Sequence, residues 1–207
     1  MQNSVSVDSN HEEEIICKFD LEDKSKICMV KGLPSNLVTK LLDYSKNDEI
    51  IKQNTSDAKR FATLEAFNEW LKKDRDIYTI TDKKKEKLMG ILWFGFRPLL
   101  KEKIKVDDIY SYLKLDNFCI TVSYRLYKDL RGKRMFTKIF KEAFNHFKQS
   151  KTYKELENKN QNDFWLETNS DNTNSLMAMQ KLGFKIIGKN HENGRVFLVY
   201  SNFLLNK

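Results

Sequence analysis

The chain is long enough for one domain, and its composition is that of a positively charged globular protein. It has 207 residues, of which 40% are hydrophobic and 32% are charged, which excludes a disordered chain and allows a substantial core. The absence of any run of about 18 apolar residues excludes a predicted transmembrane helix. Lys and Arg outnumber Asp and Glu by 37 to 29, and the net charge of +8 favours an anionic ligand.

A disordered tail over residues 1–13 is predicted to precede a single domain over residues 14–207. Up to residue 73, strand-like and helix-like patterns alternate with polar segments. Ser35 and Thr63 are candidate N-caps because each precedes apolar residues at helical spacing. The predicted elements are short strands at 14–17 and 27–30, a helix from residue 35, a loop or short helix at 44–60, and a helix over 61–73.

The second part of the chain is predicted to complete a sheet. An alternating strand, the charged turn at residues 82–87 and the apolar run LMGILWFGF predict a hairpin. Later, a helix joins two strands as a crossover, which implies one parallel pair in an otherwise antiparallel sheet. The predicted elements are strands at 76–81, 88–96, 118–126, 164–168, 184–188 and 195–201, helices over 136–148 and 171–182, a candidate short helix at 106–113, and a polar loop at 151–163.

Cysteines, histidines and the start of the chain indicate neither a metal site nor export. Cys17, Cys28 and Cys119 form no CxxC or Cys/His pattern, which is typical of reduced thiols in a cytoplasmic protein. The histidines are scattered without metal-ligand spacing. The first residues, MQNSVSVDSNHEEE, lack the basic start and apolar core of a secretory signal. We therefore expect a cytoplasmic location and no membrane partner.

Two segments carry the candidate chemistry. In RLYKDLRGKRMFTKIF, a basic turn with Arg131, Gly132 and Lys133 precedes a helix. A helix N-terminus offers unpaired N–H groups and a partial positive charge to a phosphate, and Gly132 lets the turn bend. Taken alone, a solvated basic turn is an equal alternative. In WLETNSDNTNSLMAMQKLGF, a polar turn follows a strand, and Asp171 or Asn172 can cap the next helix.

Together these segments resemble the GNAT superfamily of acyl-CoA-dependent N-acyltransferases. The family has a turn of the form RGKGIG before a helix, and residues 131–136 (RGKRMF) are similar to it. The family's next motif is N-x-x-A followed by L-Y-x-K-x-G-F. Asn172 and Ser175 resemble its first part, and residues 178–184 (AMQKLGF) resemble its second. The resemblance covers residues 14–201 and implies an α/β fold with a mixed, mostly antiparallel sheet, one parallel pair and flanking helices.

The resemblance implies an N-acetyltransferase that moves an acetyl group from acetyl-CoA to a primary amine by direct attack in a ternary complex. The pyrophosphate is then expected on the turn, and the pantetheine arm on the splayed end of the preceding strand. A small-molecule or peptide amine would be the acceptor, with residues 44–70 and 96–116 as walls, in a monomer or homodimer. The cofactor-binding residues so implied are Tyr124, Arg125, Leu126, Arg131, Gly132, Lys133, Arg134, Met135, Phe136, Asn172 and Ser175.

Three residues depart from the family pattern. Arg134 and Phe136 replace small residues near the cofactor, and Met179 replaces a tyrosine that is often the general acid. Either the large side chains turn away, or they block the site; Arg134 can also pair with a phosphate, and Phe136 can serve core packing. The alternative function is a catalytically degenerate GNAT-fold binding or regulatory protein. Glu167 is the candidate base or water-positioning residue, with a structural ion pair as its alternative.

A third interpretation, a nucleic-acid-binding protein, rests on the positive charge alone. Against it, the Lys and Arg residues are spread along the chain, and the sequence contains no nucleic-acid-binding motif. The chain is also rich in Lys and Asn, which is typical of a biased genome, so many lysines are expected to be plain solvated charges. Nucleic acid is therefore the less favoured partner.

Overall fold

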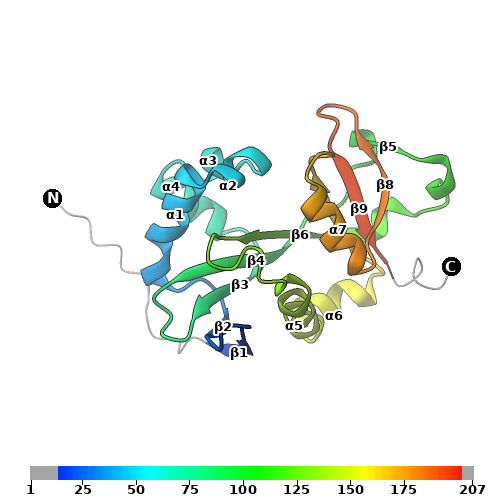
Figure 1. The fold of residues 1–207 in the computed structure, drawn as a ribbon. Coiled ribbons are helices and arrows are strands. Elements are labelled where there is room, and N and C mark those ends of the chain that lie inside the picture. Colours follow the sequence, from blue (N-terminus) through cyan, green and yellow to red (C-terminus); the bar gives the residue numbers. More distant parts are fainter. Residues whose placement is uncertain (1–13, 202–207) are drawn as a thin grey trace.

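The computed structural model describes residues 14–201, and these residues form one sheet of nine strands with helices on both faces (Figure 1). The predicted tail over residues 1–13 lies outside the described residues. The strands are β1 (Ile15–Asp20), β2 (Lys26–Lys31), β3 (Arg75–Asp82), β4 (Leu88–Phe96), β5 (Ile104–Val106), β6 (Phe118–Leu126), β7 (Asp163–Thr168), β8 (Lys185–Asn190) and β9 (Val196–Tyr200).

The order of the strands is β1-β2-β3-β4-β6-β7-β9-β8-β5. Only β6 and β7 pair in parallel among the described strands, and all other neighbours are antiparallel. The predicted hairpin of β3 and β4 is present, with Tyr78 opposite Leu92. The predicted fold class, a mixed and mostly antiparallel sheet with one parallel pair, is therefore confirmed.

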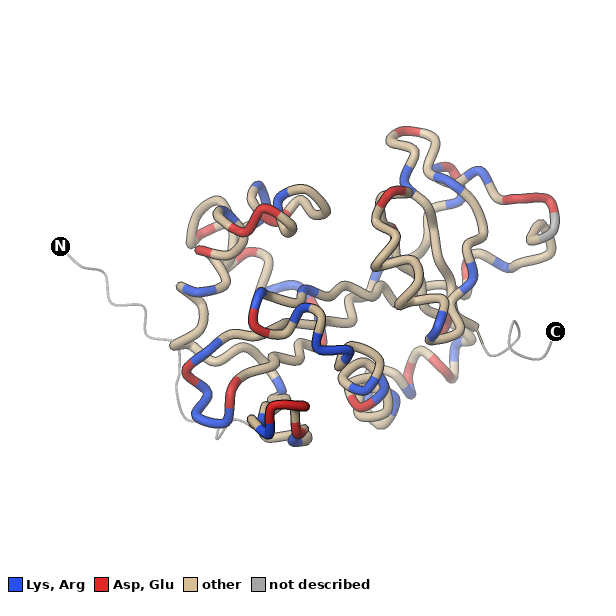
Figure 2. The backbone as a smooth tube through the Cα atoms, in the orientation of Figure 1, with Lys and Arg blue, Asp and Glu red and all other residues tan. Residues whose placement is uncertain are grey.

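The helices divide between the two faces of the sheet (Figure 1). The first four helices cover one face of the sheet, where their side chains pack with Ile77 of β3 and Ile91 and Trp93 of β4. The helices α5 to α7 cover the other face, where they pack with residues such as Tyr78, Leu92 and Phe94. Figure 2 shows positive and negative segments interleaved along most of the chain. The helices are α1 (Val38–Asn47), α2 (Glu49–Asn54), α3 (Asp57–Arg60), α4 (Leu64–Leu71), α5 (Phe136–Lys148), α6 (Lys151–Asn158) and α7 (Thr173–Lys181).

Between residues 14 and 201, every helix is too short or too polar to cross a membrane.

Three local predictions were wrong, each for an identifiable reason. The predicted polar loop at 151–163 begins with α6, because Ser150 Oγ accepts from the N–H of Tyr153 and the Tyr153 ring is buried. Ser35 is not an N-cap; it lies within a 3₁₀ turn without a side-chain capping bond. The candidate helix at 106–113 is instead the end of β5 followed by a 3₁₀ turn.

Other local predictions are confirmed. Thr63 Oγ1 accepts a 3.1 Å hydrogen bond from the N–H of Ala66 and caps α4. The polar stretch at 44–60, expected to be a loop or short helix, contains the end of α1 followed by the two short helices α2 and α3.

The helix α5 is fixed to the sheet by an aromatic cluster. Phe147, which is fully buried, stacks on Phe94 of β4 with ring centroids 4.3 Å apart and planes 14° apart. Phe140 and Phe144 on the same face of α5 contact Phe94 as well. Because buried aromatic rings contribute more area than other side chains, this cluster holds α5 at a defined place on the sheet.

We predict that Phe147→Ala lowers the free energy of unfolding by about 3–5 kcal/mol, because it removes a buried ring and leaves a cavity. Urea unfolding followed by circular dichroism measures the change. Met177→Ala is the control, since Met177 is 53% exposed and its truncation should have little effect. A loss for Phe147→Ala no larger than that of the control would contradict the packing described.

Candidate cofactor and acceptor site

The sheet opens between its two parallel strands. β6 pairs with β7 only up to Thr121, which lies opposite Trp165. Beyond that point β6 remains paired with β4 up to Leu126, whereas β7 pairs with β9 on its other side. The last residues of β6 therefore have an edge without a partner strand, at the place where the family resemblance implies a splayed end.

The open edge of β6 can be assigned to particular backbone groups. The N–H of Tyr127 donates to Met89 of β4, with a nitrogen–oxygen distance of 2.9 Å. Since backbone polar groups alternate in direction along a strand, the N–H and C=O groups of Tyr124 and Leu126 face away from β4 and toward the opening. These are the groups that an extended ligand would meet.

Two arginine side chains occupy the carbonyls of that edge. Arg125 Nη1 donates to the Tyr124 carbonyl at 2.7 Å, and Arg131 Nε donates to the Leu126 carbonyl, also at 2.7 Å. Arg131 is in turn held by the carboxylate of Asp48, which also caps α2. The side chain of Arg131 therefore fixes the strand end and does not extend into solvent.

The basic turn after β6 has the backbone of a glycine-rich loop. Gly132 has φ +76°, and Arg134 has φ +56°, a conformation that favours glycine. Arg134 stands where the resembling family has glycine, and its exposed side chain points away from the core. Within the described chain, the N–H groups of Gly132 and residues 134–138 make no hydrogen bond. Such N–H groups at a helix start form an anion-binding cradle.

The remaining residues of the turn point elsewhere. Lys133 pairs with Asp23 at 3.1 Å on the surface. Met135 and Phe136 are buried in the core, and the Phe136 ring lies 4.2 Å from the ring of Tyr124. Phe136 thus packs in the core beside Tyr124 and Phe140, which is the core-packing role that its place on the helix suggests.

Across the opening, Tyr124 contacts the start of α7. Its hydroxyl lies 2.7 Å from Ser175 Oγ, and burial raises the pKa of this tyrosine. Asn172 caps α7, with its Oδ1 accepting from the N–H of Ser175 at 3.3 Å, and its amide donates to Thr168. Of the two candidate caps, Asn172 is the one used, and its side chain has a structural role in this state.

The end of α7 follows the expected pattern. Gly183 has φ +93°, and its N–H donates to Gln180 while the N–H of Phe184 donates to Met179. These two bonds are the signature of a glycine C′ residue that ends a helix. Met179 is fully buried in the core, so it contributes no polar group to the opening.

Glu167 lies on β7, on the face opposite α5. Its carboxylate accepts from Asn190 at 2.6 Å and pairs with Arg195 at 3.8 Å. It therefore takes part in a polar cluster with the β8–β9 turn. Its role as a base stays a prediction. In that role the Glu167 carboxylate would have to accept a proton while Asn190 and Arg195 also contact it.

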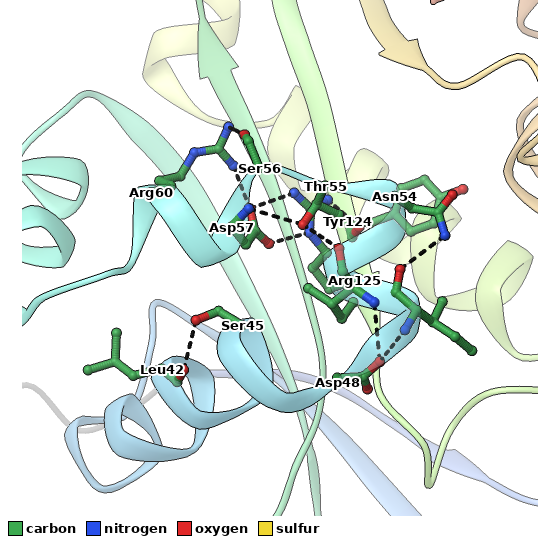
Figure 3. Close-up of polar contacts among 12 residues, drawn as sticks. Leu42, Ser45, Asp48, Asn54, Thr55, Ser56, Asp57, Arg60, Tyr124 and Arg125 are labelled. Atoms are coloured by element: carbon green, nitrogen blue, oxygen red, sulfur yellow. Dashed lines mark hydrogen bonds and ion pairs between the residues drawn. The ribbon is translucent and has the colours of Figure 1, made fainter.

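The most buried ion pair among residues 14–201 joins Asp57 to Arg125, and it was not predicted from the sequence. Asp57 of α3 accepts from Arg125 Nε at 2.5 Å and Nη2 at 2.9 Å, and Arg60 Nη1 shares the same carboxylate at 2.7 Å (Figure 3). Burial alone would raise the pKa of Asp57, but the charge and hydrogen bonds of Arg125 hold it below its usual value. Nothing in the polar segment marks Asp57, except that Arg60 follows at helical spacing.

Tyr127, the other tyrosine at the end of β6, serves packing. It is 2% exposed and stacks on Tyr44 of α1 with ring centroids 4.3 Å apart. Burial raises its pKa. Among residues 14–201, no group of His, Cys, Asp and Glu side chains is arranged to hold a metal ion.

Comparisons with known proteins identify the fold. No protein-family model and no curated protein matches the chain. Among solved structures, the ribosomal L7/L12 alpha-N-protein acetyltransferase RimL aligns over 92% of this chain and 95% of its own, with a TM-score of 0.57 and 14% identity. The GNAT domain of S. lividans PAT aligns over 89% of this chain and 95% of its own, with a TM-score of 0.55 and 10% identity.

A third structure of the same kind is spermidine N-acetyltransferase from Vibrio cholerae in complex with CoA and spermine. It aligns over 83% of this chain and 92% of its own, with a TM-score of 0.54 and 12% identity. The chain therefore has the fold of the GNAT N-acetyltransferases, as its two sequence motifs indicate.

We predict that Asp57→Asn lowers the free energy of unfolding at pH 7 by about 3–5 kcal/mol, because it leaves Arg125 buried without a counter-charge. The pKa of Asp57 is lower in the folded chain, so its contribution is complete above the unfolded pKa of about 3.9 and is lost as the pH falls below it. Urea unfolding at several pH values should show the two proteins converging at acid pH. Glu69→Gln, in an exposed pair with Lys72, is the control; a similar small change in both variants would contradict the buried pair.

Proposed function

We propose that the chain is an acetyl-CoA-dependent N-acetyltransferase that acetylates a primary amine. The observation that carries this proposal is the combination of a strand edge opened between β6 and β7 with a cradle of free N–H groups at the start of α5. The edge suits an extended pantetheine arm, and the cradle suits its pyrophosphate. Solved structures of this fold that contain CoA support the same assignment.

In the proposed complex, Arg134 and the backbone of the turn bind the pyrophosphate. The exposed guanidinium has no partner within the described chain and can pair with a phosphate in a bidentate manner. The N–H groups of Tyr124 and Leu126 face the opening and can donate to the pantetheine arm or to the thioester carbonyl. Asn172 and Ser175 approach the same opening from α7.

The proposed reaction is direct transfer. The neutral amine nitrogen attacks the thioester carbonyl carbon, a C–N bond forms, the C–S bond breaks, and CoA leaves as a thiolate. The nitrogen loses one proton, and the product is an amide. A thiol has a pKa of about 8.5, so its thiolate leaves without obligatory protonation, which fits the buried methionine at the family tyrosine position. Glu167 is the proposed proton acceptor, directly or through water.

One observation favours a second function, a degenerate GNAT-fold module that binds no cofactor. The carbonyls of Tyr124 and Leu126, which a pantetheine amide would need as acceptors, already accept from Arg125 and Arg131. In the acetyltransferase, the cofactor must bind through the N–H groups of this edge or displace an arginine. A binding measurement separates these two functions.

We predict that acetyl-CoA raises the melting temperature of the purified chain, because a ligand that binds only the folded state stabilises it. Differential scanning fluorimetry over micromolar to millimolar acetyl-CoA measures this. No shift at millimolar concentration would contradict the acetyltransferase and favour the degenerate module.

We further predict that Arg134→Gly weakens acetyl-CoA binding about 3- to 10-fold, because it removes a phosphate partner but keeps a residue suited to positive φ. The control ligand is acetyl-pantetheine, which lacks the pyrophosphate, and calorimetry should show no effect of the variant on its affinity. Equal weakening for both ligands would show that the substitution acts through the fold and not through a phosphate contact.

A further inference from the structure

The face of the sheet opposite α5 has a floor of small side chains where β6 and β7 separate. Gly95 of β4 lies opposite Thr121 of β6, and Thr121 lies opposite Trp165 of β7, so these three residues form one row across the opening. Ser123 follows on the same face, opposite Trp93. A Cβ on Gly95 would lie 2.8 Å from Thr121 Oγ1, so a side chain there would require Thr121 to shift.

The elements on its side leave this floor partly exposed. Thr121 and Ser123 are partly exposed, whereas their neighbours toward α1–α4 and toward the 99–115 segment are buried in two separate hydrophobic clusters. Figure 1 shows α1–α4 and the β5–β8–β9 part standing apart on the two sides of β6. An amine that reaches the opened edge from this face would lie on the floor.

Four arginines surround the floor. Arg75 extends the same row onto β3, opposite Gly95. On the same face, Arg97 follows the end of β4, two residues after Gly95, and Arg125 lies on β6, two residues after Ser123, so they flank opposite ends of the floor. Arg60 joins them through the carboxylate that it shares with Arg125. Each guanidinium is placed against an aromatic ring, at 4.6 Å for Arg75 on Trp70, 4.8 Å for Arg97 on Trp165, 5.0 Å for Arg125 on Trp93 and 6.0 Å for Arg60 on Phe61.

The positive charge of this group is not balanced. Asp57 is the one carboxylate that pairs with it among residues 14–201, and it serves both Arg125 and Arg60. Arg75 uses only Nε, which donates to the Trp70 carbonyl at 3.0 Å. The guanidinium of Arg97 makes no hydrogen bond or ion pair in the described chain. Glu167, the nearest carboxylate on β7 along the same face, is paired with Arg195.

The arginines are close enough to disfavour one another's charge. Burial lowers the pKa of Arg75 to about 10, and the charges of Arg60 and Arg97 act in the same direction. Burial also lowers the pKa of Arg60, with smaller contributions of the same sign from Arg125 and Arg97. An anion bound among them would remove this repulsion, whereas a second cation would increase it.

We propose that this arginine-lined floor binds a carboxylate of the acceptor, so that the acceptor is an amino acid or an acidic peptide and not a polyamine. The proposal rests on the acetyltransferase function above and assigns its substrate class. A planar guanidinium pairs with a carboxylate through two parallel hydrogen bonds, and Arg75 and Arg97 have donors free for this. The carboxylate would hold the amine over Thr121 and Ser123, beside the opened edge.

The test compares amines that differ only by the carboxylate. The two matched pairs are lysine with cadaverine, and phenylalanine with phenethylamine. Spermidine and an aspartyl dipeptide are tested as further acceptors. The assay follows the release of the CoA thiol from acetyl-CoA. We expect the carboxylate-bearing member of a pair to have a kcat/KM about 10-fold or more above its partner, mainly through KM, and spermidine to be poor. The variant Arg75→Gln/Arg97→Gln should remove this preference.

Controls separate a specific site from general charge and from the proposed function. Lys59→Gln/Lys73→Gln removes two nearby exposed charges and should keep the preference. The melting-temperature shift with acetyl-CoA should be equal in all variants. If that shift is present but cadaverine, phenethylamine or spermidine is used as well as the amino acids, the anionic-acceptor proposal is wrong and the acetyltransferase stands.

If acetyl-CoA binds but no amine is acetylated, calorimetry in the presence of CoA tests the anionic site directly. The ligands are lysine, phenylalanine and the aspartyl dipeptide. Binding of one of them that Arg75→Gln/Arg97→Gln abolishes supports the anionic site. Binding of none of them overturns it. If acetyl-CoA itself does not bind, the acetyltransferase function fails, while the same calorimetric titration without CoA still tests the arginine-lined floor.

Discussion

The structure depends on how the backbone groups at the end of β6 find hydrogen-bond partners, because the parallel pairing of β6 with β7 stops at Thr121. Exposed backbone carbonyls in a partly buried opening must find donors, because an unpaired buried polar group is costly. Arg125 and Arg131 supply them, and both depend on carboxylates from the helices above, Asp57 and Asp48. The short helices α2 and α3 are therefore tied to the strand end by charge, and their position follows from the opening in the sheet.

This arrangement gives the opening two chemically distinct sides. On the α5 side, free N–H groups and the exposed Arg134 form a cradle suited to phosphate, with the ring of Phe136 turned into the core beneath it. On the opposite face, Arg75 and Arg97 flank a floor of small residues, and each has guanidinium donors without a partner in the described chain. A cofactor and an anionic acceptor would then meet from opposite faces at the same strand edge, which is what a direct transfer requires.

Much of the fold could be predicted because its signals are local. The apolar face of α5, the caps Thr63 and Asn172 and the crossover between β6 and β7 all follow from periodicity and capping residues. The site could be predicted only in part. The turn at 131–136 has a recognisable sequence, but Asp57 lies in a polar stretch without a pattern. The alignment of Arg75, Gly95 and Thr121 in one row is set by the register of three strands, which no local pattern specifies.

Hydrogen–deuterium exchange with and without acetyl-CoA tests the central claim most directly, because it reports on the backbone groups that the site is built from. At saturating acetyl-CoA, amides in segments 132–138 and 124–126 should exchange more slowly, while those of the β1–β2 hairpin at the far edge of the sheet stay unchanged. Slower exchange elsewhere with no change in these two segments would contradict the placement of the cofactor along β6 and the start of α5.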